Sequence, residues 1–275
     1  MSEHSQGHTN LTKLESQRVA LAARISALRM THASKASHIG SSLSMIDIIS
    51  VVATGTTLAQ DSALGDELII SKGHAAAGAY AVLAHAGYIP IELLESYSTD
   101  GALLGGHVTS THVSAINLST GSLGHGLPFS VGRALAKKRM EIRGQSFILL
   151  SDGECDEGSN WEAALLASHL GLNNVSAVID RNFLQSLRST EETVQLEPLA
   201  DKWLAFNWDV EVVDGHSHED LHKAIFRKSN KPMMTIANTI KGYGVSFMEN
   251  SVPWHYKSPN DEELSLAINE LEKFL

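Results

Sequence analysis

The sequence has little cysteine, few basic residues and no long apolar run, and each shortage excludes a class of protein. A single cysteine, Cys155, excludes an internal disulfide framework and a zinc site built from cysteines, which fits a reducing cytoplasm. No run of about 18 uninterrupted apolar residues occurs, so no segment is expected to span a membrane. The 21 Lys and Arg against 31 Asp and Glu give a net charge of −10, which disfavours nucleic acid and anionic membranes as partners.

What is present is enough for a folded core. The 275 residues are 43% hydrophobic, which is sufficient for one large domain. The N-terminus lacks a basic segment followed by an apolar one, so secretion is not expected, and no linker or repeat divides the chain. We therefore expect one domain over residues 1–275, with an extended C-terminal segment over 241–275. Histidine is unusually frequent, because 14 is roughly twice the number expected for this length.

Short apolar runs alternate with helical patterns along the chain. Runs without polar alternation predict buried strands over residues 67–71, 147–151, 175–180, 210–213 and 232–239. Apolar spacing of three and four residues predicts helices over 11–33, 44–53, 75–86, 127–140, 157–170, 197–206, 218–228 and 262–274. This order indicates an α/β fold, a doubly wound and mainly parallel sheet with helices on both faces. Ligands of such sheets bind at the carboxyl ends of the strands.

Two of the predicted strands end in residues suited to a metal and a phosphate. Asp152 and Gly153 follow one strand, and Asn182 follows the next strand about one strand–helix–strand repeat later. Asp-Gly alone is most simply a turn. Neighbouring parallel strands would nevertheless place Asp152 and Asn182 side by side, and Mg²⁺ prefers such oxygen ligands together with phosphate oxygens. The glycine and the following helix N-terminus suit an anion.

The stretch SDGECDEGSNWEAALLASHLGLNNVSAVIDRNFLQS, residues 151–186, resembles the thiamine diphosphate motif. From about Leu14 to Ile268 the chain resembles transketolase, and specifically the N-terminal subunit of its split, two-chain form. Five further motifs carry the resemblance: SHIGSSLS (37–44), SKGHAAAGAYAVL (71–83), LGGHV (104–108), STGSLGHGL (119–127) and KGYGVSFMENSVPWH (241–255). The resemblance implies the thiamine-diphosphate-binding fold, with thiamine diphosphate and Mg²⁺ as cofactors. It also implies transfer of a two-carbon glycolyl unit from a ketose, or its phosphate, to an aldose.

The resemblance also assigns roles to individual residues. Mg²⁺ would be held by the side chains of Asp152 and Asn182 and by the main-chain carbonyl of Leu184. The cofactor-binding residues it implies are His74, Gly121, Ser122, Leu123, Gly153, Glu154, Asn182 and His255. His38, His107 and His255 would be the catalytic residues that hold the sugar hydroxyls, since imidazole donates, accepts and exchanges protons near neutral pH.

Other conspicuous residues have a plainer interpretation. We expect ordinary core or surface roles for His4, His8, His85, His169, His216, His218 and His222, and leave His32, His112 and His125 open. Glu157 lies where transketolases place a glutamate close to the subunit interface, but a carboxylate at a helix N-terminus is equally expected there. No base is evident for Cys155, so thiol chemistry is not expected.

Three positions depart from the family pattern and bear on the substrate. Ser151 stands where the metal loop usually has glycine, Ser37 where glycine is common, and Tyr256 where split transketolases usually have glycine. None of these changes removes a metal ligand, whereas Tyr256 would crowd the substrate channel. A housekeeping pentose-phosphate role and a specialised role on an unusual or modified sugar both remain open.

The resemblance further implies a partner. In this family a second domain supplies the glutamate that activates the aminopyrimidine, and this chain stops at Leu275, about where the first domain ends. We expect a separate C-terminal subunit within an α₂β₂ heterotetramer. Three alternatives remain: another thiamine diphosphate enzyme, such as a 1-deoxyxylulose-5-phosphate synthase or a 2-oxoacid decarboxylase component; a non-catalytic binding subunit; and a zinc hydrolase, although no HExxH spacing occurs.

Overall fold

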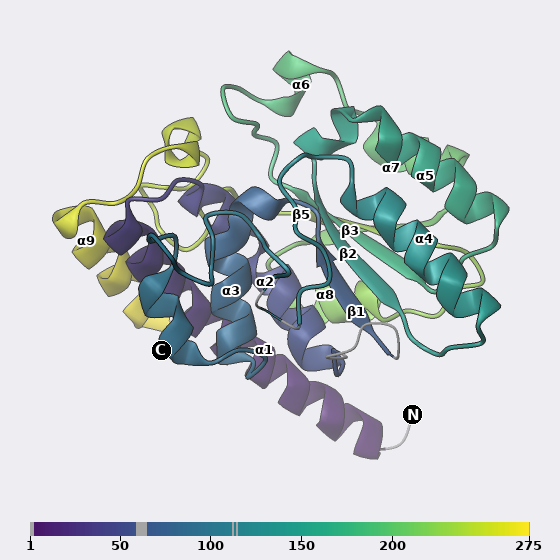
Figure 1. Cartoon of the computed structure of the whole chain (residues 1–275), viewed down its shortest axis with the longest axis horizontal. Coiled ribbons are helices and arrows are strands. Elements are labelled where there is room, and N and C mark those ends of the chain that lie inside the picture. Colours follow the sequence, from purple (N-terminus) through teal and green to yellow (C-terminus); the bar gives the residue numbers. More distant parts are fainter. Residues whose placement is uncertain (1–2, 59–64, 112, 114, 275) are drawn as a thin grey trace.

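A five-stranded parallel sheet runs through the residues that the computed structural model describes, which are 3–58, 65–111, 113 and 115–274. The strands lie in the order β1-β2-β3-β5-β4, and every neighbouring pair is parallel (Figure 1). Their bounds are β1 Glu67–Ile70, β2 Ser146–Ser151, β3 Val175–Arg181, β4 Asp209–Asp214 and β5 Met233–Asn238. All five predicted strands are confirmed to within two residues at each end.

Helices cover both faces of this sheet (Figure 1). One face packs against α4 (Gly126–Arg139), α5 (Gly158–His169) and α7 (Leu199–Ala205). The other packs against α2 (Ile39–Gly55) and α8 (His218–Ile225), while α1 (Glu3–Ser34) and α3 (Ala76–His85) pack on α2. The step from β4 back to β5 reverses direction across the sheet, so a right-handed crossover places α8 on the face opposite to α5 and α7. The predicted α/β architecture is therefore confirmed.

Shorter elements complete the chain. They are α6 (Thr190–Thr193), α9 (Asp261–Leu271), and the 3₁₀ turns η2 (Gly73–Ala75), η3 (Ile91–Ser96), η4 (Gly153–Asp156), η5 (Val252–His255) and η6 (Glu272–Phe274). The predicted C-terminal helix is thus divided into α9 and η6. Residues 241–260 are mostly irregular around η5, and α9 then packs on α1.

Helix α2 begins at Ile39 and not at Ser44 as predicted. Its first turns consist of small residues, which give little apolar signal but allow close packing. At Gly78 of α3, an added Cβ would lie 2.8 Å from the carbonyl oxygen of Ser42. Packing against α1, α3 and α8 buries every residue of α2 from Ile39 to Ala53.

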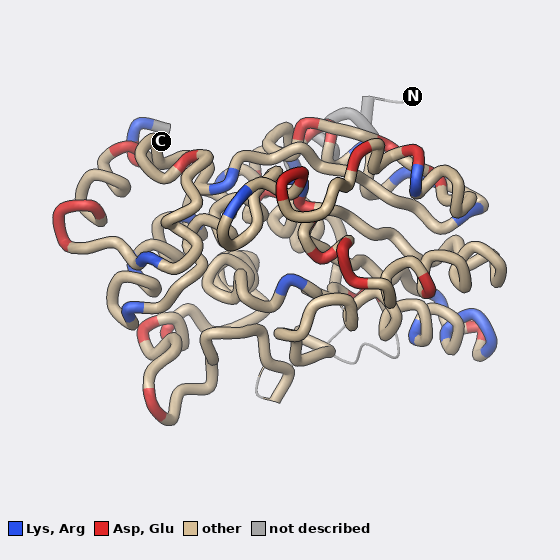
Figure 2. Tube along the Cα trace, turned by 90° about the horizontal axis from the view of Figure 1, so that it is seen from above, with Lys and Arg blue, Asp and Glu red and all other residues tan. Residues whose placement is uncertain are grey.

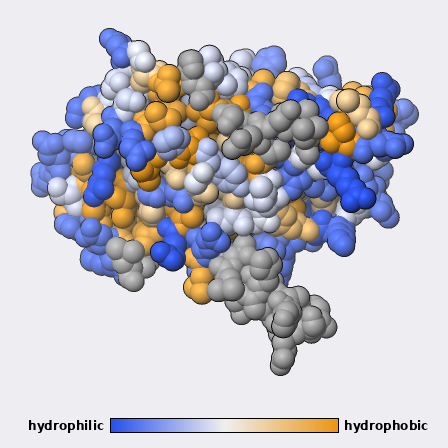
Figure 3. All heavy atoms as spheres, turned by 60° about the horizontal axis from the view of Figure 1, so that its bottom comes forward, coloured by the Kyte–Doolittle hydropathy of each residue, from blue (hydrophilic) through white to orange (hydrophobic). Residues whose placement is uncertain are grey.

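The surface mixes charged and apolar side chains. Figure 2 shows acidic and basic residues spread along the whole trace, and Figure 3 shows apolar patches between polar ones on one face. Large side chains that remain exposed include Leu14, Leu165, Leu187, Val194 and Tyr256. Within the described residues, no helix combines the length and hydrophobicity needed to cross a bilayer.

Candidate active site

The carboxyl ends of four strands open onto one cavity of about 270 Å³. Lys72 follows β1, Asp152 and Gly153 follow β2, Asn182 follows β3, and Lys241 follows β5. The remaining lining residues are His38, Ser41, His74, Gly121, Leu123, Ser151, Leu184, Gln185, Ser186, His255 and Tyr256. The cavity therefore lies where ligands bind in doubly wound sheets.

Most of the residues predicted from the motifs meet in this cavity. Its lining includes the expected metal-loop residues, the Gly121 and Leu123 loop, and three of the expected histidines. His107, Ser122 and Glu154, which the structure also describes, lie outside the lining. The His107 ring nevertheless lies against His38, with ring centroids 5.8 Å apart.

Four histidines from distant segments form one cluster. The ring centroid of His38 lies 5.3 Å from that of His74, 5.8 Å from that of His107 and 4.8 Å from that of His255. His38 precedes α2 in the left-handed conformation, with φ 72°, and its amide donates to the carbonyl oxygen of His255 at 2.8 Å. Such a conformation is strained for a non-glycine residue and is typical of functional sites.

The environment keeps three of these imidazoles neutral, those of His38, His74 and His255. Burial, followed by the neighbouring His107, Lys241 and Lys72, lowers the pKa of His38 to about 4. Burial, Lys241, His38 and Lys72 lower the pKa of His255 to about 3. Burial and then Lys72 hold the pKa of His74 well below its ordinary value. A neutral imidazole offers one donor and one acceptor, so each of these rings can donate to one bound hydroxyl and accept from another at neutral pH.

Lys241 determines which nitrogen of His255 carries the proton. Its Nζ lies 3.1 Å from Nδ1 of His255 and donates to the carbonyl oxygen of Gln185 at 3.1 Å. Burial and then Lys72 lower the pKa of Lys241 to about 8, so the ammonium form still predominates at pH 7. Because an ammonium group only donates, Nδ1 of His255 accepts and the ring proton lies on Nε2.

The two cavity lysines, Lys72 and Lys241, were not among the predicted site residues, although both lie in the quoted motifs. Each is almost fully buried. The Lys72 ammonium pairs with Asp180 and donates to the carbonyl oxygen of Ser41 at 3.2 Å. The sequence did contain a signal for Lys72, a lysine directly after a buried apolar strand. Because Lys is rarely buried without a partner, such a position indicates an ion pair or a binding site.

The donor set at the ends of β2 and β3 fits Mg²⁺. Parallel register pairs Ser151 with Asp180, so Asp152 and Asn182 extend from adjacent strands into the same cavity as Leu184. A carboxylate, a carboxamide and a carbonyl oxygen are hard ligands of the kind that Mg²⁺ takes. Among the described residues, no three His, Cys, Asp or Glu side chains are placed to hold a metal ion, so the zinc hydrolase has no ligand set there.

Asp152 is held in place by its neighbours. Its Oδ1 accepts from the amide of Gly153 at 2.8 Å, and its Oδ2 accepts from the amide of Phe183 at 2.7 Å. Burial and the nearby Asp180 raise its pKa to about 6 against the opposing effect of Arg181 and these amides. At Gly153 an added Cβ would lie 3.0 Å from Gln185 Cγ, so this loop leaves little room for a side chain.

Glu154, expected to bind the cofactor, lies below the cavity. Its carboxylate is fully buried and accepts from the hydroxyl of Ser71, from the amide of Gly124 at 2.8 Å and from the amide of Ser151 at 3.2 Å. It therefore joins the segments that follow β1 and β2 to the Gly121–Gly124 loop. Glu157 precedes α5 and is exposed, which leaves both of its interpretations open.

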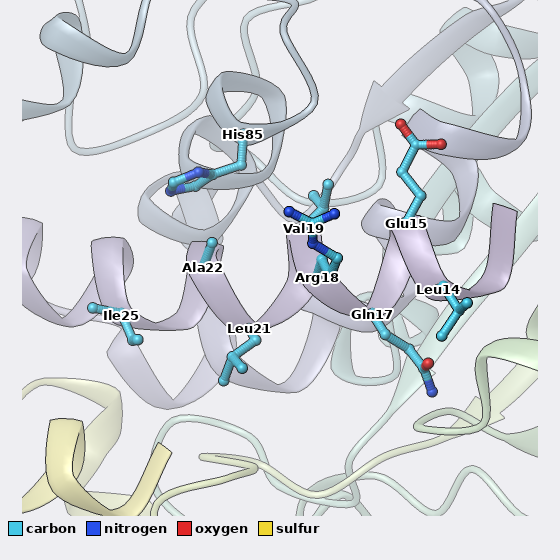
Figure 4. A pocket seen from close by; sticks show the side chains of 9 residues that line it. All are labelled: Leu14, Glu15, Gln17, Arg18, Val19, Leu21, Ala22, Ile25 and His85. Atoms are coloured by element: carbon cyan, nitrogen blue, oxygen red, sulfur yellow. The ribbon is translucent and has the colours of Figure 1, made fainter. Parts of the chain in front are cut away.

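The other histidine side chains that the structure describes do not line the cavity. His32 contacts the carbonyl oxygen of Pro259 and the carboxylate of Asp261, and His85 contacts Ser26. His85 also lines a larger hollow along α1, of about 700 Å³, which contains none of the predicted site residues (Figure 4). His125 is exposed at the start of α4. His112 and the side chains of His4 and His8 lie outside the described residues.

Comparison with known proteins agrees with this geometry. Residues 15–271 match the family described as transketolase, thiamine diphosphate binding domain. The chain belongs to the transketolase family. It is 41% identical over 209 residues to an apulose-4-phosphate transketolase subunit of Actinobacillus succinogenes, covering 75% of this chain and 76% of that one. It is 37% identical over 243 residues to a 6-deoxy-6-sulfo-D-fructose transketolase subunit of a Clostridium species, covering 86% and 88%.

Other transketolases are longer than this chain. The transketolase of Campylobacter jejuni superposes with a TM-score of 0.86 at 25% identity over 95% of this chain, but the match covers only 43% of that chain. The transketolase of Homo sapiens is 35% identical, and the match covers 38% of it. The chain thus spans less than half of these two transketolases, whereas it matches most of the length of the two transketolase subunits, as the resemblance implied.

Proposed function

We propose that this chain is the diphosphate-binding subunit of a split transketolase that transfers a two-carbon glycolyl unit from a ketose to an aldose. The observation that carries the proposal is the cluster of His38, His74, His107 and His255 beside the metal loop of Asp152 and Asn182. Residues 1–275 would form one domain. Thiamine diphosphate would supply the nucleophilic carbon and the electron sink of the reaction.

The residues of the chain divide between binding and proton transfer. Asp152, Asn182 and the Leu184 carbonyl would hold Mg²⁺, while Lys241 and His74 would face the diphosphate. His38 and His255 contribute neutral imidazoles at one end of the cavity, where they would donate to and accept from the hydroxyls of the sugar. His107 adjoins His38 and would complete this set.

The chain needs a partner to close this cavity. The segment after β3 exposes Phe183 and Leu187, which are 43% and 75% exposed, on either side of the cavity residues Leu184–Ser186. Apolar side chains at the rim of a site favour cover by another protein surface. We therefore infer a separate C-terminal subunit in an α₂β₂ heterotetramer. A single cysteine, which excludes internal disulfide bonds, is consistent with a cytoplasmic location of this assembly.

The substrate would be an unusual or modified ketose. Tyr256 stands at the mouth of the cavity, with its ring centroid 4.8 Å from that of His255. This aromatic ring reduces the space beside the sugar-facing histidines. Two similar proteins are named for apulose 4-phosphate and for 6-deoxy-6-sulfo-D-fructose, so sugars of these two kinds are the first candidates.

A donor screen on the reconstituted pair tests the proposal. The chain and its partner subunit would be mixed with thiamine diphosphate, Mg²⁺ and an aldose phosphate as acceptor. Apulose 4-phosphate, 6-deoxy-6-sulfo-D-fructose, xylulose 5-phosphate and fructose 6-phosphate would be offered in turn as the ketose donor. Formation of the shortened aldose only when both subunits and both cofactors are present supports the proposal. Consumption of pyruvate in place of any ketose, or full activity of the chain alone, would overturn it.

A further inference from the structure

His216, expected to have only an ordinary core or surface role, links a buried carboxylate to the backbone of the candidate site. Its Nδ1 lies 2.7 Å from Oδ2 of Asp47 in α2. Its Nε2 accepts a hydrogen bond of 2.9 Å from the amide of Ile240, just after β5. The side chain is 8% exposed. His216 therefore bridges a helix on one face of the sheet and the segment that enters the cavity.

The two hydrogen bonds fix the proton on this ring. A backbone amide only donates, so Nε2 carries no proton, and the single ring proton lies on Nδ1 and is donated to Asp47. The ring also stacks on Tyr243, with centroids 3.4 Å apart and planes 10° apart. Both the tautomer and the orientation of His216 are thus determined by its neighbours.

The segment that His216 holds carries Lys241. The amides of Thr239 and Gly242 donate to the main-chain carbonyls of Arg181 and Gly40 at 3.0 and 2.9 Å, whereas the amide of Ile240 donates to the side chain of His216. Gly242 has φ +82°, and an added Cβ would lie 2.3 Å from the Met248 carbonyl oxygen, so the chain turns sharply there.

Lys241 in turn orders two parts of the cavity. Its Nζ lies 3.5 Å from the carbonyl oxygen of Leu184 and 3.1 Å from that of Gln185. It also lies 3.1 Å from Nδ1 of His255. A shift of the backbone at Ile240 would therefore be passed to the metal loop and to a sugar-facing histidine.

We propose that His216 is a positioning residue that sets the place of Lys241, and through it of the Leu184–Gln185 loop and His255, by accepting the Ile240 amide. The effect on the cofactor rests on the proposed function, whereas the effect on the backbone does not. His216 touches neither cofactor nor sugar in this proposal, because it acts through residue 240.

His218 offers a matched control. Its Nε2 also contacts Asp47, at 3.0 Å from Oδ1, and it is similarly buried. Its other ring nitrogen, Nδ1, contacts the hydroxyl of Ser16 in α1 at 2.7 Å and does not reach the site. A purely structural role of the Asp47 cluster would make both histidines equally important for the cavity.

Three variants distinguish the two hydrogen bonds of His216, to Asp47 and to the Ile240 amide. His216→Asn keeps a donor near the position of Nδ1 for Asp47 and removes the acceptor of the Ile240 amide. His216→Gln places an amide oxygen near the position of Nε2, so it keeps the acceptor and gives up the donor to Asp47. His218→Gln keeps the contact with Asp47 and removes only the contact with Ser16.

Hydrogen–deuterium exchange at Ile240 and thiamine diphosphate binding test the proposal on the chain in the presence of Mg²⁺ and its partner subunit. For His216→Asn we expect exchange at Ile240 to rise and the cofactor Kd to weaken, each by about tenfold, the effect of one lost hydrogen bond. His216→Gln should keep the exchange rate at Ile240 and the cofactor Kd close to the wild-type values. His218→Gln should change neither quantity.

Equal effects of His216→Asn and His216→Gln, or an equal effect of His218→Gln, would overturn the positioning role. So would unchanged exchange at Ile240 in His216→Asn. If the wild-type pair binds no thiamine diphosphate, the proposed function is wrong, and the exchange measurement alone then decides whether His216 holds Ile240.

Discussion

Lys72 and Asp180 form an ion pair beneath the cavity, and both side chains are completely buried. The Asp180 carboxylate also accepts from the hydroxyls of Ser44, at 2.6 Å, and Thr239. Burial opposes the charge, but Lys72 and these hydrogen bonds outweigh it and lower the pKa of Asp180. The pair joins the ends of β1 and β3 and holds the floor of the site.

Removal of one partner of this pair should destabilise the fold. Lys72→Met leaves the Asp180 carboxylate buried without its cation, at a cost of about 3–5 kcal/mol. Urea unfolding measures the free energy of unfolding of this variant. The double variant Lys72→Met/Asp180→Asn removes the unpaired charge and should recover a large part of the loss. A double variant that loses the sum of the two single losses would contradict the pairing.

Asp47 should make stability depend on pH in acid. Burial raises its pKa, but Arg24, with contacts of 3.0 and 2.5 Å, and the hydrogen bonds to His216 and His218 hold the pKa well below its ordinary value of 3.8. The unfolded chain therefore takes up this proton first. The stabilisation is complete above that ordinary value and is lost as the pH falls from about 4 toward the folded pKa.

The difference in unfolding free energy between wild type and Asp47→Asn measures this contribution. It should be largest near neutral pH and shrink as the pH falls below about 4. Asp100→Asn, at an exposed carboxylate, is the control and should show a small difference at every pH. A difference for Asp47→Asn that stays constant with pH would show that the carboxylate charge is not what stabilises the cluster.

His107 should matter for transfer and not for cofactor affinity. Its ring adjoins His38 and lies outside the lining at the metal loop. His107→Ala is expected to lower kcat/KM for glycolyl transfer by about a hundredfold, the range of a lost acid–base group, and to leave the thiamine diphosphate Kd nearly unchanged. His169→Ala, at an exposed position of α5, is the control. Equal losses of transfer and cofactor affinity would remove the substrate-facing role.

Tyr256 should affect which sugar is used. Its ring is 59% exposed and lies with its centroid 6.2 Å from that of His38. Tyr256→Gly widens the mouth, so the ratio of kcat/KM for a modified ketose to that for fructose 6-phosphate should change by about tenfold. Tyr256→Phe keeps the ring and should keep the ratio. The same ratio in wild type and Tyr256→Gly would show that the ring does not select the sugar.

Local patterns were sufficient for much of the fold. Strands β1 to β3 are buried on both faces, so their continuous apolar runs could be recognised in the sequence. The loops at the carboxyl ends of β2 and β3 contain the metal-loop residues. The start of α2 could not be recognised in the sequence, because its first turns consist of small residues that pack closely against Gly78 and give no pattern of large apolar side chains. The position of β4 at the sheet edge was not predicted either, since strand order depends on crossovers.

The sequence by itself determined the fold class, the family resemblance and the segments that carry Asp152, Asn182 and the four clustered histidines. These features depend on short-range spacing and residue type. Only the tertiary structure decided that Lys72 pairs with Asp180, that Glu154 lies beneath the cavity, and that His216 joins Asp47 to Ile240. Those contacts connect segments far apart in the chain. A buried polar group is stable only with a hydrogen-bond or charge partner, and no local sequence pattern specifies which distant residue that partner is.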